Sequence, residues 1–468
     1  MAELDVAAMM AEFHDVALGD ARLNDRLQRI VERIASCPQR SFPDQMATDA
    51  DQEALYRFLA NDKVSLENVL SGHVRETCKR MVGRKTVRIL HDTSQFVFAG
   101  DREGLELLKG TTKGFFVHVA LAVSGDEARE PLGVLGAHPF SNEHVLENRE
   151  LTRTERARAK RQKTREERKS HRWEKLALQT AAALPDGTRG IHVMDQEAND
   201  YVVFQELLKA KVDFVVRGSA ERMLVGGRRV KDALAERPAR EFREVSLSAR
   251  ARKSFHRLPM RAAREARLMV RWAAISLSRP ETGTATARQL TLNVVQVFEP
   301  APPPGEEPIA WTLFTSERVE SLEDASAVVE HYRARWIIEE FFKALKTGCA
   351  FEKRQLCSLE ALKRAFGIFV PMAWKLLSIR QLGRDETARP ATVVLDDEQQ
   401  LLLRALLLER NRTLPSRPSA RDVMLAIAGL GGHIKNNGDP GWQVLGRGLE
   451  RFLDAEVGWR LARRCDQS

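Results

Sequence analysis

The sequence is poor in cysteine. Five cysteines are scattered through 468 residues, and no two of them form a Cys-x-x-Cys pair. An odd and dispersed set argues against a disulfide framework. We therefore expect reduced thiols in a cytoplasmic protein, with Cys349 and Cys357 as packing residues rather than ligands.

Long hydrophobic runs are also missing. The run IFVPMAW (368–374) is short and contains a proline, whereas a bilayer-spanning helix needs about 20 apolar residues. The first 13 residues are acidic and have no basic segment before an apolar one, so we expect no signal peptide and no membrane partner. No glycine-rich phosphate loop follows a strand-like segment, which argues against an enzyme acting on small phosphorylated ligands.

Acidic residues are fewer than basic ones. Lys and Arg total 74 against 65 Asp and Glu, which gives a net charge of +9. A basic surplus suits a polyanion such as nucleic acid, although many soluble proteins reach a similar charge. Apolar residues make up 43% of the chain, enough for substantial cores, and the length indicates two or three domains.

The first 70 residues have a helical pattern. Apolar side chains recur at the spacing of one helix face, and arginines occupy the opposite face: Leu23, Leu27, Ile30 and Ile34 against Arg22, Arg26, Arg29 and Arg33. A small helical module with an arginine face can lie on a DNA backbone. A solvated amphipathic bundle explains the same pattern equally well.

From about residue 84 the pattern changes to short β-branched runs separated by turns, then to strands alternating with helices. This predicts a mixed α/β sheet. We expect three domains: a helical domain over 1–70, an α/β domain over 71–370 with a β-rich insertion at about 220–310, and a helical domain over 371–468. Residues 321–348 are predicted to form one long helix that begins at Ser321 and ends at Gly348.

That long helix carries a polar stripe. On a regular helix, five polar side chains fall within roughly 80° of arc. Cations in such a stripe suit phosphate oxygens, and a glutamate offers a hard oxygen to Mg²⁺. A solvated face with ion pairs four residues apart is the alternative. The residues of the stripe are Tyr332, Arg335, Glu339, Lys343 and Lys346.

Two further acids follow predicted strands. Asp92 comes just after TVRIL, and Asp195 directly follows RGIHVM. Carboxylates at the ends of neighbouring strands can converge, and a third from a packed helix would complete a cage for two divalent ions that promote phosphoryl transfer. Strand-end aspartates also serve as turn or cap residues. Glu197 and Asp200 are alternatives for the second acid, and Asp195 is preferred because it directly follows the strand.

These residues resemble a known family. The pattern Tyr332-x2-Arg335-x3-Glu339-x6-Lys346 is similar to the signature of the insertion-sequence-four family of bacterial cut-and-paste transposases. The segments HDTSQ around Asp92, MDQEAND around Asp195 and WTLFTSERVESL (311–322) resemble this family in the same order. The resemblance covers almost the whole chain.

The resemblance implies a ribonuclease H-like catalytic core with a β-rich insertion, flanked by helical N- and C-terminal domains. Asp92, Asp195 and Glu339 would be the catalytic residues and would hold two Mg²⁺ ions, for which Mn²⁺ should substitute. The implied chemistry is nicking at the transposon end, hairpin formation, reopening of the hairpin and joining of the 3′ ends to target DNA.

The resemblance also implies DNA contacts. Transposon ends with terminal inverted repeats, and target DNA, would be the partners of a homodimer formed through the C-terminal helices. Trp311 would stack on a flipped base near the end, although it also fits a core strand position. Trp336 would contact the DNA of the transposon end or pack beneath its own helix. The remaining implied contacts are Tyr332, Arg335, Lys343, Lys346 and Arg217 at the cleaved end, and Arg22, Arg26 and Arg57 at the repeat.

Two other functions, and the role of two arginine-rich stretches, remain open from the sequence. A DNA-binding protein derived from a transposase but catalytically weak, or a nuclease that cuts without joining, would share much of this sequence. The arginine-rich stretches 153–172 and 250–271 could be further DNA contacts or solvated helices.

Overall fold

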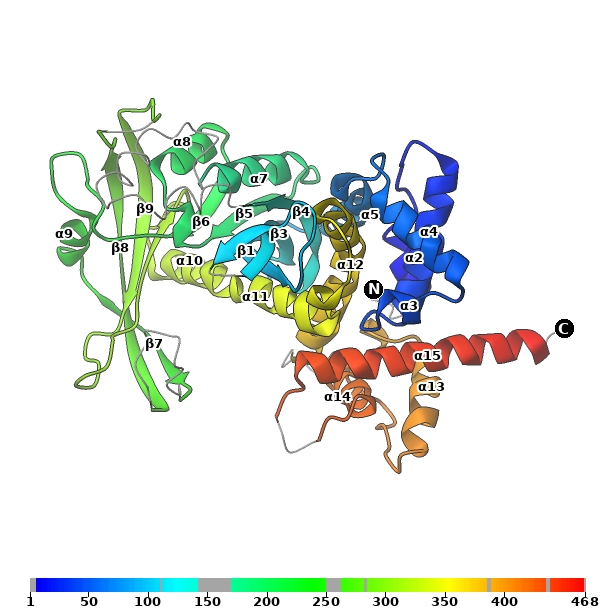
Figure 1. The fold of residues 1–468 in the computed structure, drawn as a ribbon. Coiled ribbons are helices and arrows are strands. Elements are labelled where there is room, and N and C mark those ends of the chain that lie inside the picture. Colours follow the sequence, from blue (N-terminus) through cyan, green and yellow to red (C-terminus); the bar gives the residue numbers. More distant parts are fainter. Residues whose placement is uncertain are drawn as a thin grey trace.

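A computed structural model describes residues 6–109, 112–141, 170–249, 262–281, 284–384, 389–434 and 438–466. A helical N-terminal region and a helical C-terminal region lie at one end of the molecule, and a large sheet with its covering helices extends to the other (Figure 1). Most of the two arginine-rich stretches, 153–172 and 250–271, lies outside the described residues.

The N-terminal region is helical as far as Met81, beyond the predicted limit near residue 70. The apolar face that the spacing predicts on the second helix is buried, with Leu27 and Ile34 fully enclosed. Asp20, Thr48 and Ser65 each cap a helix by accepting a backbone N–H two or three residues ahead. The helices are α1 (Val6–Ala11), α2 (Ala21–Ser36), α3 (Phe42–Gln45), α4 (Asp49–Ala60) and α5 (Leu66–Met81).

The ten strands form one continuous sheet in the order β2-β3-β1-β5-β6-β10-β9-β8-β7, with β4 paired to β3. β1, β5 and β6 are parallel, and β3 and β4 are antiparallel to their neighbours, an arrangement that fits a ribonuclease H-like core. The strands are β1 (Thr86–Phe98), β2 (Glu106–Lys109), β3 (Thr112–Ser124), β4 (Pro131–Phe140), β5 (Arg189–Met194), β6 (Asp213–Arg217), β7 (Arg240–Leu247), β8 (Arg264–Ser278), β9 (Gln289–Phe298) and β10 (Ala310–Thr315).

Helices cover both faces of this sheet (Figure 1). α7 (His171–Ala182) and α8 (Tyr201–Lys209) pack on one face, where Trp173 and Phe204 are buried. α10 (Leu322–Ala334), α11 (Trp336–Lys343) and α12 (Leu359–Arg384) pack on the other. The segment expected to be a β-rich insertion supplies α9 (Val230–Ala235) and strands β7 to β9, which extend the sheet rather than forming a separate one.

The C-terminal region consists of α13 (Asp397–Leu408), α14 (Ala420–Leu430) and α15 (Trp442–Asp466). Short helical turns link the longer elements: η1 (Gln196–Ala198), η2 (Ala344–Gly348), η3 (Phe351–Lys353) and η4 (Ala391–Val393). Within the described residues, every helix is too short or too polar to cross a membrane.

The prediction of one long helix over 321–348 is wrong. Ser321 begins α10 with a capping box, but the helix tightens at Arg335. There the N–H of Arg335 donates to the Tyr332 carbonyl, and the N–H of Ile338 to the Arg335 carbonyl, each three residues back. After α11 the backbone becomes the π-helical turn η2. The regular 3.6-residue spacing that placed five polar groups in one stripe therefore does not hold across this segment.

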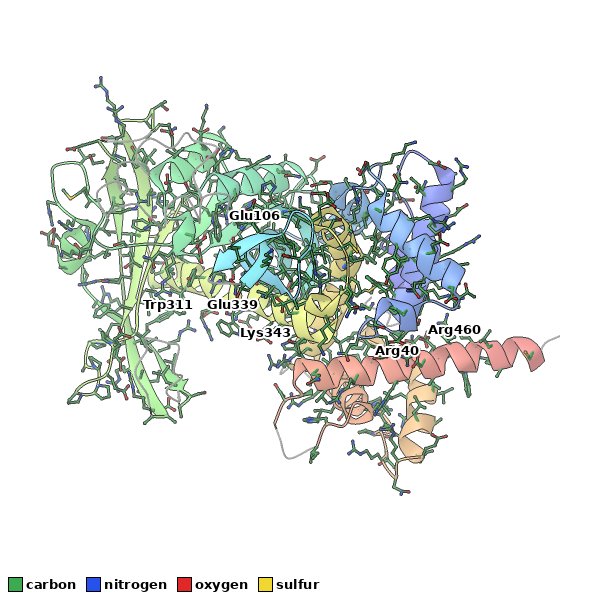
Figure 2. All side chains as sticks on the ribbon, in the orientation of Figure 1. Arg40, Glu106, Trp311, Glu339, Lys343 and Arg460 are labelled. Atoms are coloured by element: carbon green, nitrogen blue, oxygen red, sulfur yellow. The ribbon has the colours of Figure 1, made fainter. Side chains whose placement is uncertain are left out.

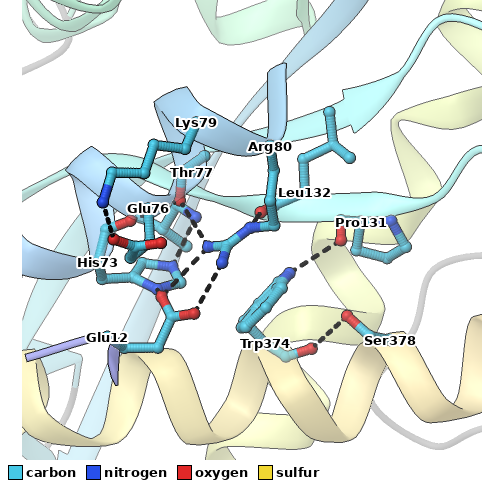
Figure 3. A network of polar contacts seen from close by, with 11 residues as sticks. Glu12, His73, Glu76, Thr77, Lys79, Arg80, Pro131, Leu132, Trp374 and Ser378 are labelled. Carbon is cyan, nitrogen blue, oxygen red and sulfur yellow. Dashed lines mark hydrogen bonds and ion pairs between the residues drawn. The ribbon is translucent and has the colours of Figure 1, made fainter. Parts of the chain in front are cut away.

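A buried polar network joins the first helices to the sheet (Figure 3). Glu12, 4% exposed, lies 2.5 Å from His73 Nδ1 and accepts a hydrogen bond of 2.7 Å from Arg80 Nη1. The N–H of Val134 in β4 donates to His73 Nε2, so the imidazole is neutral and carries its proton on Nδ1. The Arg80 guanidinium also lies 4.1 Å from the ring centroid of Trp374 in α12.

Glu12 is held as a carboxylate by this network. Burial acts to raise its pKa, but the hydrogen bonds from His73 and Arg80 and the charge of Arg80 outweigh burial and lower it to about 2. A depressed pKa stabilises the fold above the unfolded-state value of 4.5, and this stabilisation is lost as the pH falls towards 2.

We predict that Glu12→Gln lowers the free energy of unfolding by about 3 kcal/mol at neutral pH, because it removes the buried carboxylate and leaves the half-buried Arg80 charge without its partner. Urea denaturation would measure this loss. Glu76→Gln is the matched control, since it breaks only the surface pair with Lys79 and should cost less than about 1 kcal/mol. The difference in the free energy of unfolding between wild type and Glu12→Gln should become smaller as the pH falls from 4.5 to 2. A difference that stays constant over this range would contradict the lowered pKa of Glu12.

Candidate active site

Asp92 and Asp195 lie on the same face of the sheet. β1 and β5 are parallel, with Leu90 paired to Val193, and each acid follows its paired residue by two positions. Because side chains alternate along a strand, each acid shares the face of that residue. Leu90 and Val193 pack in the same core as Ile338 of α11. The two aspartates therefore lie on the side of the sheet that α10 and α11 cover.

Arg335 links Asp92 to Glu339. Its Nη1 is 3.0 Å from Asp92 Oδ2, and its Nη2 forms an ion pair with Glu339 Oε1, one turn further along in α11. Glu339 lies on the helix that passes beside the central strands (Figure 2). One guanidinium thus spans a carboxylate of β1 and a carboxylate of α11.

The carboxylates share one electrostatic environment. Burial raises the pKa of Asp92 to about 6; Arg335 and the N–H of Thr93 oppose this rise, and the charges of Asp195 and Glu339 add to it. Burial likewise raises the pKa of Asp195, although the N–H of Glu197 donates to this carboxylate at 2.7 Å. Mutually repelling, half-buried acids favour a cation between them.

The donor set fits a hard divalent ion. Three carboxylates supply the oxygen ligands that Mg²⁺ binds in phosphoryl-transfer sites. In the described part of the chain, however, no three Asp, Glu, His or Cys side chains are close enough together to hold a metal ion. The cation between Asp92 and Glu339 in this arrangement is Arg335.

The two alternatives for the second acid have other surroundings. Asp200 caps α8 by accepting the N–H of Val202 at 2.8 Å, and it also accepts a hydrogen bond from Ser170. Glu197 is exposed on η1. Of the three acids that follow β5, Asp195 lies nearest the strand end, and the charge of Arg335 acts on its carboxylate.

Tyr332, Trp311 and Arg217 meet beside the acids. The ring of Tyr332 contacts Trp311 edge to face, with centroids 5.3 Å apart, and Arg217 at the end of β6 lies near enough for its charge to oppose the rise that burial causes in the Tyr332 pKa. Tyr332 is only 6% exposed, so it is not part of a solvent-facing stripe. Trp311 on β10 is half-buried and keeps part of its indole accessible.

Trp336, Lys343 and Lys346, the other predicted DNA contacts of this segment, do not share one surface. Trp336 is 56% exposed, so it does not pack beneath its helix, and Lys343 Nζ lies 4.9 Å from the centroid of its indole. Lys346, in η2, instead lies 5.0 Å from the Phe96 ring centroid and 4.0 Å from Glu352 Oε1, and burial lowers the pKa of this lysine. The single predicted stripe is therefore divided by the change in helical geometry.

The N-terminal arginines line a common cavity. Arg22, Arg26 and Arg57 surround a hollow of about 290 Å³ between α2 and α4, and Lys63 joins them. Arg22 pairs with Asp20 at 3.2 Å and Arg57 with Glu53 at 3.5 Å, but both arginine side chains remain well exposed. Sequence reasoning missed Lys63 because it follows the helix and belongs to no periodic face.

A row of buried histidines on the opposite sheet face was also missed. His91 stacks between His118 and His192, with centroids 5.6 and 5.2 Å away, and His91 Nε2 is 2.9 Å from His192 Nδ1. Burial lowers the pKa of all three, to about 3 for His118 and His192. His91 and His192 adjoin the acidic segments in sequence, but strand alternation directs them to the other sheet face, where their neighbour in the row, His118, packs against Trp173 of α7.

Comparison with known proteins identifies two domains. Residues 6–64 match the model of a transposase DNA-binding domain, and residues 140–370 match the model of a transposase DDE domain. Asp195 and Glu339 lie within the second range, and Asp92 precedes it.

Among solved structures, a piggyBac transposase synaptic complex with hairpin DNA is similar over 81% of this chain and 75% of that chain, with 8% identity and a TM-score of 0.38. A likeness at this level carries no weight for fold or mechanism, and the assignment rests on the two domain matches. The chain therefore joins a transposase DNA-binding domain to a DDE transposase domain, and the protein is a DDE transposase, a metal-dependent enzyme of DNA transposition.

Proposed function

We propose that this enzyme binds terminal inverted repeats, excises its element by nicking and hairpin formation, and joins the 3′ ends to target DNA, as the resemblance to insertion-sequence-four transposases implies. Asp92, Asp195 and Glu339 are the catalytic acids of this proposal. The observation that carries it is the placement of two acids on one sheet face, with Glu339 tied to Asp92 through Arg335; Asp195 follows the end of β5, whereas Asp92 lies within β1, which continues to Phe98 instead of ending before the acid as the sequence predicts.

The three acids would hold two divalent ions, Mg²⁺ or Mn²⁺, which when bound activate a water or 3′-hydroxyl and stabilise the leaving oxygen. Each step of excision and joining is an in-line displacement at phosphorus, so one site can serve all of them. Arg335 would supply charge for phosphate oxygens beside the acids, and Lys343, which pairs with Glu340 and lies over Trp336, would do so further along α11. Tyr332, whose ring packs against Trp311 and whose hydroxyl lies near Arg217, would position the strand next to the reacting phosphate.

We predict that Asp92→Ala, Asp195→Ala or Glu339→Ala lowers the rate of end cleavage about a thousandfold while end binding stays near wild type. Loss of several kcal/mol of transition-state stabilisation implies a factor of this size. Cleavage of a plasmid carrying the DNA that flanks the gene, with Mg²⁺, measures the rate, and gel shifts measure binding.

Glu197→Ala is the matched control for these variants, because it removes an exposed acid two residues from Asp195. It should cleave at close to the wild-type rate. Cleavage that survives in Asp195→Ala but is lost in Glu197→Ala would move the second acid to Glu197.

The cationic cavity between α2 and α4 is proposed to contact the phosphates of the inverted repeat. We predict that Arg57→Ala weakens binding of end DNA and reduces the slope of log affinity against log salt by about 1, since one phosphate contact is lost. Arg33→Ala is the control, as Arg33 is exposed on α2 but does not line the cavity. Equal losses in the two variants would argue against the cavity as a contact site.

Trp311 is proposed to stack on a base flipped out near the transposon end. We predict that Trp311→Ala slows hairpin formation by about tenfold or more relative to first-strand nicking, because stacking on an aromatic ring contributes about 1–3 kcal/mol. Trp311→Phe should retain most hairpin formation. Denaturing gels that separate nicked from hairpin ends measure both products, and a parallel loss of nicking and hairpins would point to a packing role instead.

A homodimer through the C-terminal helices is part of the proposal. Three apolar side chains near the end of α15 are 40–55% exposed, which is the kind of surface that a second copy can cover. They are Val457, Trp459 and Leu461.

A further inference from the structure

We propose that Arg335 is an internal cation that occupies the place between Asp92 and Glu339 until a divalent ion binds, and that ion binding releases its guanidinium to a DNA phosphate. This inference rests on the proposed function, because it takes Asp92 and Glu339 as metal ligands.

The contacts of Asp92 leave neither oxygen free. Oδ1 accepts the N–H of Thr93 at 2.8 Å, and Oδ2 accepts from Arg335 at 3.0 Å. The second arm of the same guanidinium is paired with Glu339. The side chains of Asp92 and Arg335 are each 16% exposed and that of Glu339 is 29% exposed, so solvent screens these ion pairs only in part.

A divalent ion and this guanidinium compete for the same oxygens. An ion shared by Asp92 and Glu339 would lie where the guanidinium lies. The ion and the guanidinium cannot both stay there, because two neighbouring cations repel strongly in a half-buried site. In this structure the two acids are arranged around Arg335.

The position of Arg335 allows release without unfolding a helix. The residue lies at the tightened joint between α10 and α11, and its guanidinium forms ion pairs with the two acids. A freed guanidinium stays beside the site and binds phosphate through two parallel hydrogen bonds. Metal binding and end binding are thereby coupled through one side chain.

The first test measures Mn²⁺ binding to the full-length protein without DNA, by electron paramagnetic resonance of free Mn²⁺. Arg335→Gln should bind Mn²⁺ about three- to tenfold more tightly than wild type, and Arg335→Lys should fall between them, because a lysine cannot span both acids. Arg333→Gln is the control: Arg333 pairs with Glu330 and should leave Mn²⁺ affinity unchanged. Unchanged or weaker Mn²⁺ binding by Arg335→Gln would overturn the inference.

Two further variants separate this inference from the proposed function. Asp92→Asn and Glu339→Gln should each lose Mn²⁺ binding. If both bind Mn²⁺ as wild type does, these acids are not ligands, and the proposed function and the inference fail together. If both lose Mn²⁺ but Arg335→Gln binds like wild type, only the inference fails.

The second test measures the release step. A duplex carrying one transposon end is titrated with protein in EDTA and in Ca²⁺, which binds oxygen ligands. Arg335→Gln should weaken end binding less than about twofold in EDTA and about fivefold or more in Ca²⁺, the range of a typical coupling between two ligands. An equal loss in both conditions would show that Arg335 contacts DNA independently of metal and would overturn the release.

Discussion

The parallel pairing of β1 with β5 is the constraint on which the rest of the site depends. It fixes which residues face α10 and α11, and with them the side of the sheet on which Asp92 and Asp195 lie. A shift of one residue in either strand would send one aspartate to the histidine face. Every other component of the proposed centre, from Glu339 to the Tyr332–Trp311 contact, is arranged on helices and strands that pack against this pair.

Much of the fold and part of the candidate site could be predicted from sequence. The apolar runs before Asp92 and Asp195 indicated buried strands, and the structure has β1 and β5 there. Strand alternation then suffices to separate the acids from His91 and His192, although no local pattern indicated that the histidines would form a row. The place of Lys63 in the cavity could not be predicted for a similar reason, since only the packing of α2 against α4 brings this lysine beside the arginines.

The failure at residues 321–348 has a physical cause. Periodicity assumes one helical pitch, whereas this segment changes pitch at Arg335 and again after Lys343. The change accompanies tertiary contacts: Tyr332 is buried against Trp311, and Arg335 is bound by an acid of another element. Such contacts leave no trace in local spacing, so a signature that reads as one surface is divided among a buried phenol, an ion-paired arginine and a lysine packed on Phe96.

The Glu12 network has a consequence for shortened forms of the chain. Removing the first 12 residues, which include α1 and Glu12, would take away the only carboxylate hydrogen-bonded to Arg80 among the described residues and leave the guanidinium over Trp374 without an acidic partner. A polypeptide that begins after Glu12 would therefore lose fold stability where α5 packs on β4 and α12, and would also lack part of the DNA-binding domain. The hydrogen bonds among Glu12, His73 and Arg80 thus tie the N-terminal helices to the sheet that carries the proposed catalytic acids.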